Sequence, residues 1–137
     1  KKSPNTKMTK YIYLDTHFET ISPTAEGKSL PVPHCIKGNR RSQAYGGLAD
    51  ALKGKLWFWK KIHSRRLKWQ SILRQDFDTI ELCGLVSNIC ILSNAVMAKS
   101  ACPNSEIIVD SSLTAAADEE MHHKSLDVMK GLFIKVL

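Results

Sequence analysis

Apolar positions in the second half of the chain recur with the periods of alternating strands and helices. A short apolar run from Thr79 to Leu85 predicts a buried strand that ends in a turn. Ser87 or Asn88 is then expected to cap a helix that ends near Pro103, because short polar side chains can bond the first backbone N–H groups of a helix. The spacing of one buried helical face predicts three inward residues, Ile89, Leu92 and Val96.

The alternation continues to the last residue. Glu106 to Asp110 has the pattern of a second buried strand, and Ser111 to Ala117 that of a loop of small residues. Asp118 is expected to cap a second helix with acidic residues in its first turn, and Phe133 to Leu137 to form a final strand. The residues expected to face inward from the second helix are Met121, Leu126 and Met129.

Strands that alternate with helices of this length indicate right-handed crossovers and a parallel sheet covered by helices on both faces. The predicted class is therefore α/β. Ligands of such sheets bind beyond the carboxyl ends of the strands, so the loop from Gly84 to Asn88 is the first candidate for a site.

The first half of the chain gives weaker signals. Tyr11 to Leu14 is expected to form a strand ending at Asp15, followed by a loop rich in Thr, Ser, Pro and Gly. Leu48 to Leu52 has a helical pattern, and Leu56 to Trp59 has that of a strand. Ile62 to Gln75 is assigned to a helix, although its period is not clean and its ends lack good caps.

Length and composition suit a single domain over residues 1–137, since 43% hydrophobic residues can bury an ordinary core. The four cysteines lack the paired spacing of a zinc knuckle, and no charged-then-apolar leader is visible, which favours reduced thiols in the cytoplasm. No apolar run approaches the roughly 20 residues that span a bilayer, so no membrane role is expected.

The net charge of +7 is concentrated in an acid-free basic run from Lys53 to Arg74. With Trp57, Trp59 and Trp69 as stacking surfaces, this run could bind a single-stranded nucleic acid. No recognised nucleic-acid module surrounds it, so a nucleic acid is not the expected partner.

Cys90 is the candidate nucleophile, because it lies two or three residues inside the start of a predicted helix. Unpaired backbone N–H groups and the positive end of the helix dipole stabilise a thiolate there, which lowers the pKa of the thiol and raises its reactivity. The same N–H groups can receive the oxyanion of a tetrahedral intermediate. On position alone, a small buried helix residue is the more common interpretation.

The run from Ile80 to Val96 resembles the signature of the isochorismatase-like cysteine hydrolases, the superfamily that contains the nicotinamidases. That signature is an apolar strand, Gly, two apolar residues, Thr or Ser, Asp or Asn, any residue, and the nucleophilic Cys; the matching residues here are Gly84, Leu85, Val86, Ser87, Asn88 and Cys90. The likeness continues through Glu106 to Ser112 and the helix after it. About sixty consecutive residues therefore resemble the family.

The resemblance implies a three-layer fold and places features around Cys90. A cis peptide bond is expected at Leu85–Val86, and the backbone N–H groups of Val86 and Cys90 are expected to form the oxyanion hole. Asn88 departs from the Asp of many members, which bears on the substrate more than on the fold.

A metal site is also implied by the resemblance. Nicotinamidases contain an Asp-x-His motif followed by a Pro-His-Cys segment, and Asp15, His17 and His34 match these ligands residue by residue. Carboxylate and imidazole ligands suit a catalytic divalent metal, and zinc is the expected one. Without the resemblance, these residues would read as solvated polar side chains.

The family triad joins the Cys to an Asp of the first strand and a Lys of a later one. The first strand is not visible in this sequence, and the Lys strand is altered. Reading Phe58 to Gln75 one nucleotide out of phase, with suitable codons, would give a close family-type motif, and a shift in the other direction does so for Asn39 to Ala44. In the first register the family lysine falls on Lys61, with Lys60 as its nearest rival.

The sequence therefore predicts a hydrolase of nicotinamidase type, with Cys90 and Lys61 as catalytic residues and a small-molecule amide as substrate. A homo-oligomer is expected, since relatives often self-associate. Hydrolysis of another small amide or of an isochorismate-like vinyl ether is the alternative within the enzymes. A catalytically impaired remnant of the fold is a further alternative, because the first-strand Asp is not visible.

Overall fold

The structure is a computed structural model, and it describes residues 12–15, 23, 25–29, 33, 36, 38–39, 46–47, 50, 53, 56–59 and 77–137. The chain divides into two compact units, Lys1–Ile62 and His63–Leu137. A single domain over residues 1–137 stays a prediction. None of the helices in the described ranges is long and apolar enough to cross a membrane.

The first unit contains two short parallel strands. β1 (Ile12–Asp15) pairs with β2 (Leu56–Trp59), so that Asp15 lies opposite Trp59. Both strands were predicted, with β1 one residue earlier. A four-residue helix, α2 (Ala25–Lys28), interrupts the segment expected to be a loop, so that expectation is wrong at this turn. The helix assigned to Ile62–Gln75 lies outside the described residues.

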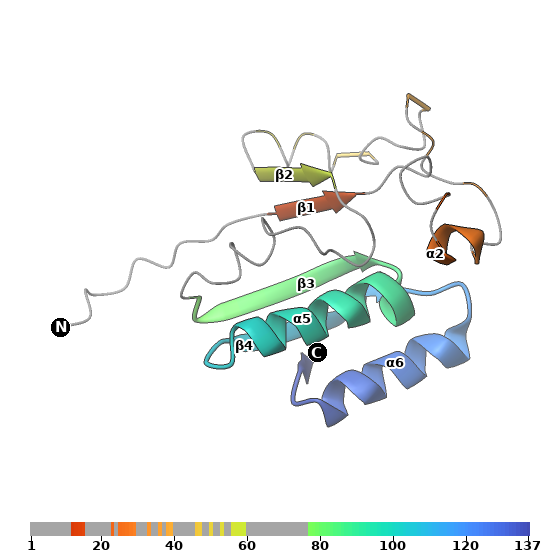
Figure 1. Ribbon diagram of the computed structural model, residues 1–137. Helices are drawn as coiled ribbons and strands as arrows, with labels where there is room; N and C mark the ends of the chain where they lie inside the picture. The colour runs from red at the N-terminus through yellow and green to blue at the C-terminus, as the bar shows by residue number, and fades with distance from the viewer. Residues whose placement is uncertain are drawn as a thin grey trace. The chain divides into compact units, whose positions relative to one another are not determined.

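The second unit is a three-stranded parallel sheet with two crossover helices (Figure 1). The sheet order is β3 (Thr79–Leu85), β4 (Glu106–Ala115) and β5 (Lys135–Val136). α5 (Leu92–Ala101) connects the first pair and α6 (Glu119–Gly131) the second. Because both crossovers step across the sheet in the same direction, right-handed connections place both helices on one face. The parallel α/β prediction is confirmed.

Helices on a second face of this sheet, which a three-layer fold requires, are not among the elements described in residues 77–137. The three-layer arrangement therefore stays a prediction. The face that carries α5 and α6 is the one that positions the candidate site, because these helices begin at the carboxyl ends of β3 and β4.

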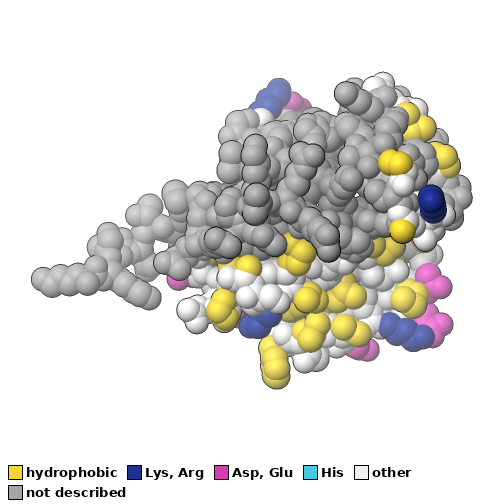
Figure 2. All heavy atoms as spheres, viewed as in Figure 1, with side chains coloured by type: hydrophobic (Ala, Val, Ile, Leu, Met, Phe, Trp, Pro, Cys, Tyr) yellow, Lys and Arg dark blue, Asp and Glu magenta, His cyan; other side chains and the backbone are white. Residues whose placement is uncertain are grey.

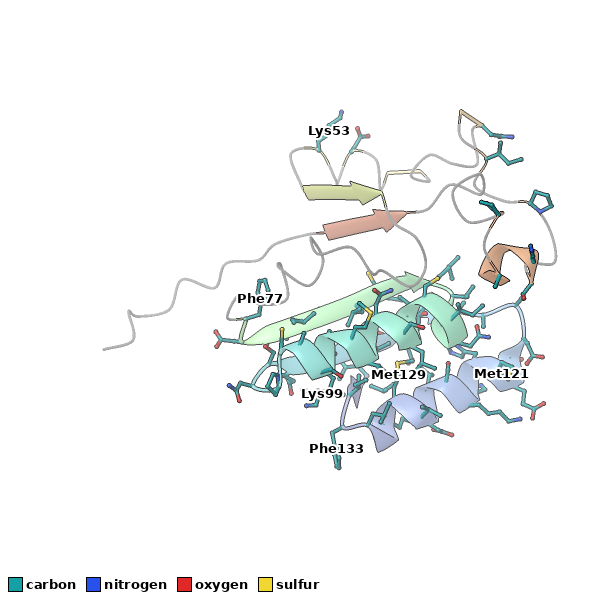
Figure 3. The ribbon with its side chains drawn as sticks, in the orientation of Figure 1. Lys53, Phe77, Lys99, Met121, Met129 and Phe133 are labelled. Atoms are coloured by element: carbon teal, nitrogen blue, oxygen red, sulfur yellow. The ribbon has the colours of Figure 1, made fainter. Side chains whose placement is uncertain are left out.

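The core of this unit lies between the sheet and the two helices. Ile107 and Val109 alternate with half-buried neighbours along β4 and are almost fully buried, as one inward face of a strand should be. Leu126 and Met129 pack inward from α6, as predicted, and Met129 lies between the two helices in Figure 3. Met121 was also expected to face inward, but 43% of it is exposed.

The buried face of the first helix was predicted incorrectly. Ile89 and Val96 are exposed, and Leu92 is only half-buried. The residues that face the core are Ile91, Asn94, Ala95 and Ala98. The physical reason is a π-helical turn, Ser87–Ile91, which precedes α5 and has more residues per turn than an α-helix. It rotates the following residues away from the face that a regular period of 3.6 predicts.

The second strand is longer than predicted. β4 runs through Ala115, so Ser111–Ala115 is strand and only Ala116 to Asp118 connects it to α6. Leu82 lies opposite Val109 but Gly84 lies opposite Thr114, which shows that β4 bulges. The polar Ser111-Ser112 segment lies in this bulge without a partner on β3, and pairing resumes at Thr114, which residue types alone do not predict.

α6 ends in a Schellman motif. The backbone N–H of Ile134 donates to the Met129 carbonyl and that of Phe133 to the Lys130 carbonyl, each at 3.0 Å. Phe133 has φ 60 and is 86% exposed, so it belongs to this turn and not to the strand predicted from Phe133 to Leu137. β5 itself is confirmed in a shorter form.

Hydrophobic side chains are exposed on the surface of this unit where α5 and α6 lie (Figure 2). The more exposed members on the two helices and the turn after them are Val96, Met121, Val128, Leu132 and Phe133. Self-association would bury surface of this kind. The homo-oligomer stays a prediction.

Candidate active site

The candidate site begins where β3 ends. Gly84 has φ 115, a conformation that side-chain-bearing residues rarely adopt. The peptide bond between the two residues that follow, Leu85–Val86, is cis, as the family resemblance predicted. The chain then enters the π turn directly, so the sequence places Cys90 inside a turn whose entry is set by a glycine.

The π turn is closed by backbone hydrogen bonds, among them those to the Val86 and Ser87 carbonyls. The Val86 carbonyl accepts from the N–H groups of Ile89 at 3.3 Å and Ile91 at 3.1 Å. The Ser87 carbonyl accepts from the N–H of Leu92, the first residue of α5. π turns within helices are frequent at functional sites, which makes the turn itself a signal.

The predicted side-chain cap of this helix is wrong. Val86 occupies the cap position, and no described side chain caps the turn. Ser87, one of the two predicted caps, is fully buried, and its hydroxyl bonds a histidine of another helix. Ser87 does lie at the start of the helix, but its hydroxyl bonds a residue of another element and not the backbone of its own helix.

Cys90 lies in the fourth position of the π turn and is half-buried. It is not in a disulfide bond. Its carbonyl accepts a 2.7 Å hydrogen bond from the Asn94 side-chain amide, which lies one turn later in α5. The backbone at the nucleophile candidate is thus held from within the helix.

His122 connects α6 to the π turn. Its Nδ1 lies 2.8 Å from the Ser87 hydroxyl oxygen, and the tautomer of the ring decides which atom donates. The backbone N–H of His122 donates to the Asp118 carbonyl, and its carbonyl accepts from the Ser125 hydroxyl. Both hydrogen bonds fix the histidine within the first turns of α6.

From sequence alone, helix packing or solvent contact is the expected role of His122 and His123. His123 matches the solvent part of that interpretation, since it is exposed and lies 3.9 Å from the Glu119 carboxylate. The contact between His122 and Ser87 was missed, because the two residues are 35 positions apart and no local pattern relates them. His122 also lines a pocket of about 380 Å³, together with Ser111, Leu126 and Leu137.

The N-cap of α6 is confirmed. The Asp118 carboxylate accepts a 2.8 Å hydrogen bond from the Met121 backbone N–H, and Glu119 and Glu120 lie in the first turn. Negative charge at this end complements the helix dipole. The cap therefore fixes the start of the helix that carries His122.

The other described cysteines lie in less reactive surroundings. Partial burial raises the pKa of the Cys83 thiol, and the Glu81 and Asp110 carboxylates raise it further. Cys83 is exposed on β3, so the expectation of a buried strand residue is wrong for its side chain. Cys102 is buried at the end of α5.

Asp110, which acts on Cys83 from the neighbouring strand, is itself held in the charged form. The Ser112 hydroxyl donates to its carboxylate at 2.7 Å and the Ser112 N–H at 2.9 Å. These hydrogen bonds lower the pKa of the Asp110 carboxyl, the hydroxyl contributing more. A carboxylate fixed in this way keeps its effect on the nearby thiol at neutral pH.

The remaining predicted site residues cannot be placed side by side. Asp15 ends β1, where only the backbone is described, while His17, His34 and Lys61 lie outside the described residues. Within the described ranges, no group of three or more His, Cys, Asp or Glu residues could hold a metal. The metal ligands, the catalytic lysine and the oxyanion roles of Val86 and Cys90 stay predictions.

Comparison with known proteins gives a family and a set of similar structures. A family model described as the isochorismatase domain matches residues 9–137. The nicotinamidase/pyrazinamidase from Bacillus subtilis is similar over 91% of this chain and 73% of its own, with 23% identity and a TM-score of 0.75. The pyrazinamidase/nicotinamidase from Streptococcus mutans is similar over 92% of this chain and 74% of its own, with 27% identity and a TM-score of 0.72.

A third similar structure is the pyrazinamidase of Pyrococcus horikoshii in complex with zinc. The likeness covers 92% of this chain and 72% of that one, with 15% identity and a TM-score of 0.67. At this identity it shows the fold alone. No curated protein sequence matches the chain.

Proposed function

The chain belongs to the isochorismatase family of hydrolases, and from that membership we propose that it is a cysteine-dependent amidohydrolase of nicotinamidase type. The observation that carries the proposal is the position of Cys90, half-buried in a π turn that is separated from the end of β3 by Val86 alone. Two similar structures are of enzymes named for nicotinamide and pyrazinamide, which supports a small aromatic amide as substrate.

The proposed reaction has two stages. The Cys90 thiolate attacks the carboxamide carbon, and the backbone N–H groups of Val86 and Cys90 hold the oxyanion that forms. When the C–N bond breaks, the nitrogen leaves as ammonia after gaining a proton, and a thioester remains on Cys90. Water then adds to the thioester carbon, the C–S bond breaks, and the carboxylate product leaves. Lys61 helps to hold charge and orientation.

Asp15, His17 and His34 would hold a divalent metal, for which zinc is the proposed identity. One carboxylate and two imidazoles fit the donor chemistry of a catalytic zinc site. When bound, the metal would anchor the substrate ring or polarise water. The zinc complex of the Pyrococcus horikoshii pyrazinamidase supports this choice.

The setting of the enzyme is also part of the proposal. We place it in the cytoplasm as a homo-oligomer that takes a small-molecule substrate and binds neither nucleic acid nor membrane. If the basic run from Lys53 to Arg74 bound a nucleic acid, the affinity for single strands would fall with rising salt concentration. A titration with single-stranded nucleic acid at several salt concentrations therefore tests the absence of a nucleic-acid partner independently of the enzyme assay.

The test of the proposed function is ammonia release from nicotinamide and pyrazinamide by the 137-residue chain and by Cys90→Ala. We expect slow release that Cys90→Ala abolishes, because the family's proton-shuttling Asp is not visible in these residues. General acid–base help of that kind is worth roughly 10²–10⁴-fold. In parallel, either amide should protect Cys90 from alkylation.

Three outcomes separate the possibilities. Release that survives Cys90→Ala would remove Cys90 as the nucleophile. Neither release nor protection with any of several small amides would count against the amidohydrolase, and turnover of a vinyl ether in its place would support the alternative within the family. Fast release that Cys90→Ala abolishes would show that another residue supplies the base.

A further inference from the structure

Hydrogen bonds at Val86, Ser87 and Cys90 hold the π turn, and the partner of Ser87 lies on another helix. Backbone bonds hold the Val86 carbonyl, and the Asn94 amide holds the Cys90 carbonyl. Both of these are local to the turn and α5. The bond between Ser87 and His122 is different, because it joins the first residue of the turn to α6.

Because Ser87 is buried, water cannot replace His122 as the partner of its hydroxyl. The residue is 0% exposed. A buried hydroxyl that loses its partner bears the cost of desolvation, and the turn that carries it must rearrange to find another partner. The position of α6 and the geometry of the nucleophile turn are therefore coupled through the hydrogen bond between Ser87 and His122.

We infer that His122 is a positioning residue, which holds the π turn through Ser87 so that the backbone N–H groups at the helix start face the Cys90 thiolate. The inference rests on the proposed function, since a positioning role presupposes that Cys90 is the nucleophile. His122 does not touch the reacting atoms in this role. Its contribution is to keep the positive end of the helix where a thiolate benefits from it.

The test is the rate of Cys90 alkylation by limiting iodoacetamide at neutral pH, measured by peptide mapping relative to Cys83 in the same sample. We expect His122→Ala to lower this ratio by roughly two- to tenfold, the fold-change that corresponds to one ordinary hydrogen bond. His122→Asn should restore it to within about twofold, because an amide can place a polar atom near the position of Nδ1.

The matched control is His123→Ala. His123 is the neighbouring histidine on α6, and its ring packs edge-on against that of His122 at a centroid distance of 5.3 Å. Its removal deletes a ring and an exposed charge partner but leaves the Ser87 contact in place. The labelling ratio of His123→Ala should therefore equal that of the wild type.

A double-mutant cycle provides the second measurement. If His122 acts through Ser87, then Ser87→Ala combined with His122→Ala should label no more slowly than the slower single variant. Additive effects would overturn the inference. So would an unchanged or raised ratio in His122→Ala, an effect of equal size in His123→Ala, or failure of His122→Asn to restore the ratio. If His122→Ala does not fold, Ser87→Ala and His122→Asn carry the same comparison.

The hydrolysis assay separates this inference from the proposed function. Where ammonia release is measurable, His122→Ala should lower kcat with little change in KM, since substrate contacts are kept. No amide hydrolysis by the wild type, together with the expected labelling pattern, would refute the proposed function and leave the coupling intact. Cys90-dependent hydrolysis that is the same in His122→Ala and the wild type would refute the positioning role alone.

Discussion

Phe133→Gly should stabilise the protein, although it removes a large apolar side chain. Phe133 holds φ 60 at the end of α6 and is 86% exposed, and Figure 3 shows it pointing away from the helices. Little buried area is lost on its removal. A left-handed conformation costs a residue with a side chain roughly 1–2 kcal/mol. The greater freedom of glycine in the unfolded chain offsets roughly 0.5–1 kcal/mol of the relief.

The net expectation is a free energy of unfolding about 0.5–1 kcal/mol higher than that of the wild type. The Schellman hydrogen bonds of the turn persist in the variant, because they are made by the backbone. Equilibrium urea unfolding measures the difference, provided that the slope of the transition is unchanged.

Two controls isolate the cause. Phe133→Ala also removes the ring but keeps the left-handed penalty, so it should be no more stable than the wild type. Leu132→Gly introduces glycine at the preceding residue, whose φ is −92, and should lose stability without any relief. Equal stability of Phe133→Gly and Phe133→Ala would refute the reasoning, because relief of the left-handed backbone should exceed the cost of the greater freedom of glycine in the unfolded chain.

Three further predictions concern the site and the helix beside it. Cys90 should be alkylated before Cys83, although Cys83 is the more exposed residue, since partial burial of its thiol and the Glu81 carboxylate raise the pKa of Cys83. Glu81→Gln should speed the labelling of Cys83, and preferential labelling of Cys83 in the wild type would contradict this order. Asp118→Ala should lower the free energy of unfolding by about 1 kcal/mol while Asp118→Asn should not, and urea unfolding in which the two variants agree would exclude the cap. His17→Ala should lose bound metal in elemental analysis, whereas metal content equal to that of the wild type would remove His17 from the ligand set.

The sequence by itself determined the order and type of the main strands and helices of residues 77–137. Strands β3 and β4, the two helices and the Asp118 cap follow from signals within a few positions of each other, namely apolar period and short polar caps. The cis bond at Leu85–Val86 was placed by the family motif around it. Local chemistry is sufficient for the strands, the helices and the cap, because their partners are neighbours in the chain, whereas the cis bond was expected only from the resemblance to the family.

The tertiary structure alone decided which residues meet. The π turn changed the buried face of the helix that carries Cys90, and a bulge carried β4 beyond its predicted end. The sheet register brought Asp110 near Cys83, and the crossover of α6 brought His122 to Ser87. These contacts join residues on different elements, so their distances depend on register and packing, which a period read along one segment does not contain.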